Sequence, residues 1–224
     1  MNLILYYLFV YLIEAIILWL YCNRIFTSRK NTFLSLLITI GMFSLLIPVA
    51  ILTNAALNAF CSFIVYLCCI VLNYDSKPVW ALFHALALTI LMALSEGLIA
   101  AAIPGITIYA FRDGSIHSPA FTFVILSKSV YLCISQLVTR IFSKDTVNNA
   151  SIRKSTLMLY LIPVMSSIIT VSLCYICLNG KLSGTDSVIV FICLVLLLSI
   201  NILTFYLQQD ISQKNVEYAR LQIE

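Results

Sequence analysis

The sequence predicts an all-α membrane protein, a polytopic bundle of transmembrane helices. Of its 224 residues, 62% are hydrophobic and 10% are charged, whereas a soluble domain carries about 25% charged residues. The mean hydropathy is +1.05. Apolar residues come in long runs such as Val188 to Leu198, and not in the alternating segments of about 10 residues that build a membrane barrel. Hydrocarbon is therefore the expected solvent for most of the chain.

Seven stretches are long and apolar enough to cross a hydrocarbon core about 30 Å thick as helices of about 20 residues. Thr53 and Asn54 alone separate the second stretch from the third, so these two are expected to form a tight helical hairpin, and six spans is the alternative total. We expect a transmembrane domain over residues 1–207 and the start of a cytoplasmic helix over 208–224. The predicted spans are Leu3–Cys22, Phe33–Leu52, Ala55–Asn73, Val79–Ile103, Ala120–Ile141, Thr156–Leu178 and Val188–Leu207.

Prolines mark the ends and bends of these helices. Pro78 stands where the fourth span should begin, and Pro104-Gly105 where it should end. Pro48 and Pro163 lie inside the second and sixth spans. Each removes a backbone hydrogen bond there, which predicts a kink in its helix.

The basic residues orient the bundle, because loops rich in Lys and Arg are retained in the cytoplasm. Of the 13 Lys and Arg residues, only Arg112 and Lys181 fall on the opposite side, and Lys128 lies within a span. This asymmetry predicts a multi-pass protein of the cell membrane with its N-terminus outside and its C-terminus in the cytoplasm. The net charge of +4 suits loops that meet anionic lipid, so the bilayer, and no nucleic acid, is the expected partner.

Four titratable side chains lie within spans: Glu14, His84, Glu96 and Lys128. A charged residue at a helix centre costs about 2.5 to 3.5 kcal/mol, so each should face protein or water. Glu96 and Lys128 lie about 10 and 12 Å below the outer ends of consecutive helices, which predicts that they pair. The pair is either structural or part of a ligand-responsive site.

The other side chains in spans give less specific predictions. Gly97 and Ala101 form a small-xxx-small pair that would allow the fourth and fifth spans to approach closely. Glu14 lies near mid-membrane without an assignable partner. His84 lies near the cytoplasmic end, where an interfacial or hydrogen-bonded histidine is expected and not a catalyst.

The longest predicted outer loop, Pro104 to Pro119, combines aromatic and charged side chains. Tyr109, Arg112 and Asp113 stand close together there and, with Glu96 and Lys128, form the candidate ligand-binding set. Such a loop could bind a small extracellular peptide. It could equally rest its aromatic side chains in the lipid interface.

No catalytic, metal or cofactor site is predicted. All eight cysteines fall in spans, where they suit apolar packing better than disulfide or metal chemistry. Cys174 and Cys177 have redox spacing but no His or Asp nearby. Glycine-rich phosphate loops, HExxH and GxSxG are missing from the sequence. We therefore predict no cofactor, and enzymatic activity stays open.

The chain after the seventh span is polar and favours a helix. Leu207, Ile211, Tyr218 and Leu221, with Lys214 between them, follow the alternating four-and-three spacing of a coiled-coil seam. Two heptads suit either a last helix that runs out into water or a signalling helix that pairs with a second copy of the chain.

The short hydrophobic hairpins, the basic loop before the penultimate span and the segments NILTFYLQQDISQK and NVEYARLQIE resemble the membrane sensor region of GHKL-type histidine kinases. This class includes the accessory-gene-regulator peptide receptors of bacterial quorum sensing. The resemblance implies a two-component receptor whose last helix leads to a phospho-accepting histidine and an ATP-binding domain. No histidine follows His117, so we expect a fragment, a truncation or a kinase-less relative.

Two functions remain as hypotheses. The first is a receptor module that binds an extracellular or membrane-borne ligand, such as a peptide, and signals through the seventh helix of a homodimer. The second is a small transporter or substrate-binding membrane subunit, in which Glu14, Glu96 and Lys128 line a path.

Overall fold

The computed structural model describes residues 3–52, 55–103, 118–141 and 184–221, together with Ser166 and Ile169. These residues form helices joined by short turns and one two-stranded ribbon. The helices are α1 (Leu3–Ile25), α2 (Thr32–Ser44), α3 (Leu46–Ile51), α4 (Ala55–Asn73), α5 (Pro78–Ala102), α7 (Ser118–Ile141) and α11 (Gly184–Leu221).

The described helices confirm the all-α fold and most of the predicted spans. Four stretches are long and apolar enough to cross a membrane: Leu3–Ile25, Thr32–Ile51, Pro78–Ala102 and Pro119–Arg140. Two shorter apolar stretches, Leu57–Asn73 and Val188–Thr204, fall within the predicted third and seventh spans. The predicted sixth span and its Pro163 lie outside the described residues, except for Ser166 and Ile169. A multi-pass membrane protein follows, while the sidedness of the bundle stays a prediction.

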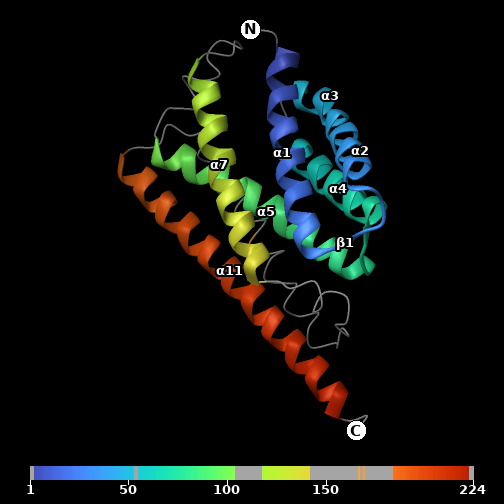
Figure 1. The fold of residues 1–224 in the computed structure, drawn as a ribbon. Helices are drawn as coiled ribbons and strands as arrows, with labels where there is room; N and C mark the ends of the chain where they lie inside the picture. The colour runs from blue at the N-terminus through green and yellow to red at the C-terminus, as the bar shows by residue number, and fades with distance from the viewer. Residues whose placement is uncertain are drawn as a thin grey trace.

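The helices pack in two layers. In one layer α1 lies between α7 and α2, and in the other α5 lies between α11 and α4. The layers meet where α5 and α11 contact α7 and where α2 and α3 contact α4. Figure 1 shows α5 passing behind α1 and α7, while α7 and α11 both run from the N-terminal end of the molecule toward its C-terminal end.

Proline positions explain where helices begin, break and end. Pro78 occupies the first turn of α5, where a missing N–H removes no helical bond. α5 stops at Ala102, since Ile103 precedes Pro104 and is disfavoured in the helical region. The predicted kink at Pro48 is confirmed, because α2 ends at Ser44, the residue whose carbonyl the proline ring would meet. The Leu45 N–H then bonds to the Met42 carbonyl in a tighter turn.

A two-stranded ribbon joins the ends of α1 and α4, which the all-α prediction did not include. Strand β1 (Thr27–Ser28) pairs antiparallel with β2 (Tyr74–Asp75), with Thr27 opposite Asp75. The Arg29 guanidinium lies 3.1 Å from the Asp75 carboxylate. The ribbon places the turns that follow α1 and α4 on one side of the bundle, as the topology prediction requires.

Tyr74 anchors this ribbon to the helices. Its hydroxyl donates to the Asn23 side-chain oxygen at 3.2 Å and accepts from the Ser35 hydroxyl at 3.3 Å. Burial raises the pKa of Tyr74 above the ordinary value for a tyrosine. The hydroxyl therefore keeps the proton that it donates.

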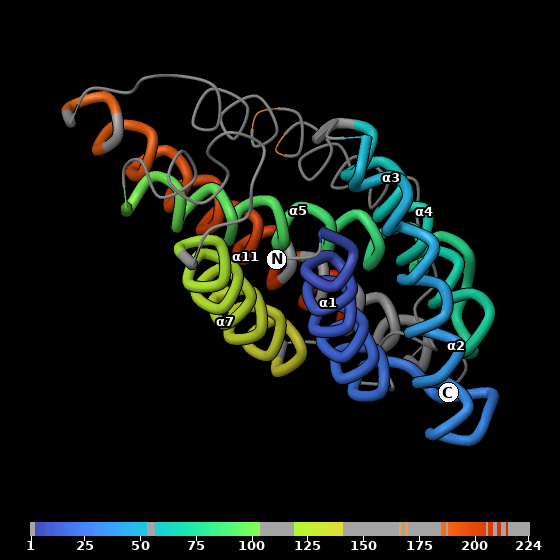
Figure 2. Tube along the Cα trace, turned by 90° about the horizontal axis from the view of Figure 1, so that it is seen from above, coloured from blue at the N-terminus to red at the C-terminus, as the bar shows by residue number. Residues whose placement is uncertain are grey.

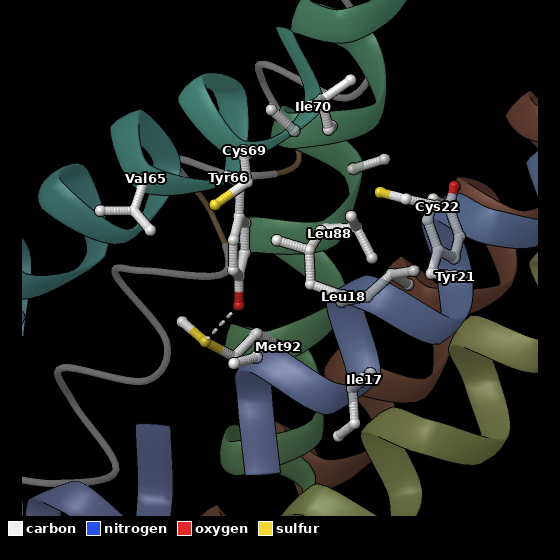
Figure 3. Close-up of a cluster of buried hydrophobic side chains, with 14 of the residues drawn as sticks. Ile17, Leu18, Tyr21, Cys22, Val65, Tyr66, Cys69, Ile70, Leu88 and Met92 are labelled. Atoms are coloured by element: carbon white, nitrogen blue, oxygen red, sulfur yellow. Dashed lines mark hydrogen bonds between the residues drawn. The ribbon is translucent and has the colours of Figure 1, made fainter. Parts of the chain in front are cut away.

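The core lies between α1, α4 and α5, with contributions from α2, α3 and α7. Its side chains are mainly aliphatic and aromatic, and the Tyr66 hydroxyl bonds to the Met92 sulfur at 3.2 Å. Figure 3 shows side chains that three helices contribute to this core: Ile17, Leu18, Tyr21 and Cys22 from α1, Val65, Tyr66, Cys69 and Ile70 from α4, and Leu88 and Met92 from α5. Cys22 and Cys69 are buried free thiols here, in agreement with their predicted packing role.

Candidate charged site between α1, α5 and α7

Three helices bring their charged residues together in one cluster, which we call the charged triad: Glu14 of α1, Glu96 of α5 and Lys128 of α7. The Lys128 ammonium donates to Glu14 Oε1 at 2.5 Å and to Glu96 Oε1 at 2.5 Å. One lysine is therefore shared by two carboxylates from two different helices. The predicted Glu96–Lys128 pair is confirmed.

The partner of Glu14 is a correction to the sequence analysis. Glu14 was expected to lack an assignable partner, and it pairs with Lys128. This pair could have been predicted from the similar positions of Glu14 and Lys128 along their helices. Glu14 and Lys128 lie about 16 and 15 Å from the N-terminal ends of their helices at 1.5 Å per residue, about half the thickness of a hydrocarbon core of about 30 Å.

Burial differs sharply between the two carboxylates. The side chains of Glu14 and Lys128 are each 3% exposed, whereas that of Glu96 is 39% exposed. The second oxygen of Glu14, Oε2, is buried and has no hydrogen-bond partner in the described part of the chain. With all three groups ionised the triad carries one negative charge in excess, and only Glu96 is open to an approaching molecule.

Tyrosines surround the triad. Tyr6 and Tyr11 of α1 are buried and couple electrostatically to triad residues, Tyr6 to Glu96 and Tyr11 to Glu14. The Tyr11 hydroxyl donates to the Asn58 side-chain oxygen of α4 at 2.8 Å, and its ring stacks on that of Tyr7. The site is thus polar at its centre and aromatic at its wall.

Tyr131 adds a polar group on α7. It lies three residues after Lys128, which places both on one helix face. Its ring is fully buried, and its hydroxyl interacts with the hydroxyl of Tyr66 on α4. Like Tyr11, it couples electrostatically to Glu14 and Lys128.

The small residues of α5 lie on a helix that contacts both α7 and α11. Ala101 packs in a cluster that α5 shares with α11, and the role of Gly97 and Ala101 in the approach to α7 stays a prediction. The cluster consists of Ile90, Leu94, Leu98 and Ala101 of α5 and Val190 and Leu194 of α11. α5 therefore uses different faces for α11 and for the triad.

A second polar contact lies toward the opposite end of α1 and α5. His84 is fully buried, and its Nδ1 is 2.8 Å from the Tyr21 hydroxyl. The rings of Phe26, Trp80 and Phe83 surround the imidazole. The prediction of a hydrogen-bonded histidine is confirmed, although its tyrosine partner was not foreseen.

The remaining predicted site residues are only partly described. Tyr109, Arg112 and Asp113 lie outside the described residues. In the tail, Leu207 is exposed and Ile211 half-buried on the continuous helix α11, and Lys214 pairs with Asp210 at 2.7 Å. The side chains of Tyr218 and Leu221 lie outside the description, so the predicted seam stays a prediction.

Comparison with protein-family models, with curated proteins and with solved structures finds no match to this chain. Among the described residues, no group of three or more His, Cys, Asp or Glu side chains could hold a metal ion. The class that the fold defines is thus a helical membrane protein, and its function must be argued from the charged triad and from α11.

Proposed function

We propose that this chain is the sensor module of a membrane receptor, in which the outer half of the bundle binds a ligand and α11 carries the signal to the cytoplasm. The observation that carries the proposal is the continuity of α11 from Gly184 to Leu221. A helix of 38 residues is about 57 Å long, nearly twice the thickness of a hydrocarbon core. Its polar part therefore extends well beyond the membrane as one rigid element.

The packing of α11 supports a link between the triad and this output. α11 packs against α5 and α7, the helices that carry Glu96 and Lys128. A ligand that binds one arrangement of α5 and α7 more tightly than another would shift the population toward it. Because α11 rests on both helices, its position would change with them.

The exposed face of α11 supports pairing with a second copy. Leu196, Ile200, Leu203 and Leu207 are all exposed along one side of the helix, and the predicted seam continues this side through Ile211. In the membrane such a face meets lipid or another helix, and in the cytoplasm an apolar seam favours a partner. A homodimer built along α11 would cover both.

Crosslinking between copies tests this function. Single cysteines at Ile211, Tyr218 or Gln213 are placed in a cysteine-free background in native membranes. Crosslinks at Ile211 and Tyr218 should form much faster than at Gln213, which lies off the seam. Addition of the physiological ligand should change the ratio of these rates. Equal, slow rates at all three positions would contradict the receptor proposal.

The alternative is a small transporter or substrate-binding membrane subunit, and the depth of Glu14 and Lys128 favours it. Transporters place their binding polarity near the bilayer midplane, where these two residues lie. This function predicts solute flux in proteoliposomes that is lost on Glu96→Gln and kept when residues 208–224 are deleted. The receptor proposal predicts no flux and dependence on the tail.

A further inference from the structure

The charged triad has two carboxylates and one ammonium, so with all three groups ionised it could bind one more cation. The exposed carboxylate of Glu96 is where a cation from outside could bind. Two carboxylates share the single ammonium of Lys128. An ionised group exposed within a transmembrane helix is unfavourable unless it meets water or a counter-charge. Glu96 is the triad member with an accessible side chain, 39% exposed, on the outer half of α5. The excess negative charge of the triad favours a cationic ligand over an anionic or a neutral one.

We propose that Glu96 anchors a binding site for an organic cation, an ammonium or guanidinium group carried by the ligand. The proposal rests on the receptor function above and names the ligand chemistry of the same site.

Three observations support an organic cation over a metal ion. Tyr6 lies close enough to couple electrostatically to Glu96 and Lys128, and its ring contacts Tyr7 and Phe121 edge-on, with centroids 5.4 and 5.7 Å away. Aromatic rings beside a carboxylate suit ammonium groups, which they attract through their faces. A calcium ion would require six to eight oxygen ligands, and the described residues offer no such group.

Two buried acceptors provide for the rearrangement that binding requires. Glu14 Oε2 is buried without a hydrogen-bond partner in the described part of the chain, and the Tyr131 hydroxyl, which lies beside that of Tyr66, couples electrostatically to both Glu14 and Lys128. When a ligand cation takes Glu96, Lys128 can turn fully to these two groups. The ion pair between Glu96 of α5 and Lys128 of α7 is then lost, and the ion pair between Glu14 of α1 and Lys128 becomes stronger. Glu14 and Glu96 each have a cation as partner both with and without the bound ligand.

The experiment uses the full chain in lipid nanodiscs and two matched probes. Choline carries a quaternary ammonium, and its carbon isostere dimethylbutanol has the same shape without the charge. Binding is measured by titration of the tyrosine absorbance and fluorescence. The wild-type chain should bind choline and not the isostere. Glu96→Gln should weaken choline binding by about tenfold or more, because the quaternary ammonium then loses its counter-charge.

Asp75→Asn is the matched control, because it neutralises a carboxylate whose partner Arg29 is exposed outside the membrane. It should leave choline binding unchanged. Both variants should show the same thermal unfolding midpoint as the wild type within a few degrees, since Glu96 is partly exposed. Equal choline binding by wild type and Glu96→Gln, or equal binding of choline and its isostere, would overturn the proposal, as would no binding by the wild type.

Different experimental results would contradict the cation-binding site and the receptor function. Choline binding that depends on Glu96 but leaves crosslinking at Ile211 unchanged would uphold the site and contradict the receptor. Crosslinking that responds to an uncharged ligand, and still responds in Glu96→Gln, would uphold the receptor and overturn the site. Tests of Glu14 use Glu14→Gln only as a second variant, because Glu14 is deeply buried.

Discussion

Lys128 is the residue through which α1, α5 and α7 are held together by charge. Removing it leaves Glu14 buried without a cation. Breaking a buried ion pair in this way destabilises a protein by about 3 to 5 kcal/mol, because the remaining charge has lost its partner. We therefore expect Lys128→Met to lower the thermal unfolding midpoint of the chain in nanodiscs strongly.

Lys214→Met is the matched control. Lys214 pairs with the Asp210 carboxylate, and both side chains are largely exposed, so its loss should change stability by less than about 1 kcal/mol. The double variant Lys128→Met/Glu14→Gln should recover part of the loss, since no buried charge then lacks a partner. Equal stability of Lys128→Met and Lys214→Met would show that the triad contributes no stability.

The Tyr21–His84 contact gives a second prediction for single residues. Tyr21→Phe keeps the ring but removes the hydroxyl that meets His84 Nδ1, inside a fully buried cluster. The expected loss of stability is about 1 to 3 kcal/mol, as for other buried polar groups that lose a partner. Tyr206→Phe, at an exposed position of α11, should have almost no effect. Chemical unfolding in detergent micelles compares the two, and equal losses would contradict the prediction.

Sequence reasoning could find part of the site and not the rest, for a physical reason. Glu96 and Lys128 lie on helices that follow each other in the chain, and consecutive helices are usually neighbours. The pairing of Glu14 with Lys128, and of Tyr21 with His84, joins α1 to helices far along the chain. Which distant helices meet depends on the packing of whole faces, and spacing within one helix carries little information about that.

At the scale of elements, the proposed pairing depends on the rotation of the α11 tail about the helix axis relative to the membrane part of the same helix. Inserting one alanine between Leu207 and Gln208 rotates the tail by about 100° relative to the membrane part. Crosslinking at the original Ile211 should then fall to the rate at Gln213. Duplicating residues 208–214 adds one heptad and keeps the phase within about 20°, so the rapid crosslinking should return. Equal rates for the two insertions would mean that the tail does not pair along this seam.

The elements show how far local chemistry predicts structure. The breaks at Pro48 and Pro78 follow from the proline ring and could be placed from sequence. The ribbon of β1 and β2 could not. Each strand has two residues, too few for a recognisable alternation, and the pairing exists because the ends of α1 and α4 are brought together by the core between them.

For the whole molecule, the testable property is sidedness. Reporter fusions at Asp145 and Glu217 should both report the cytoplasm, and a fusion at Asp113 the outside, because the basic loops are retained. The ribbon adds one requirement, namely that fusions at Arg29 and Asp75 report the same side as each other. A common side for Asp113 and Asp145 would contradict the predicted topology.

Because Glu14 and Lys128 lie far apart in the sequence, the triad cannot form until long after α1 has been synthesised. Lys128 leaves the ribosome more than a hundred residues after Glu14, which takes about 6 to 23 s at the usual rates of translation. For that interval α1 enters the bilayer with its only acidic residue lacking a cation, at a cost of about 2.5 to 3.5 kcal/mol if it is ionised. The apolar residues of α1 must carry the insertion alone, and the arrival of α7 marks the moment when α1 becomes fixed in place.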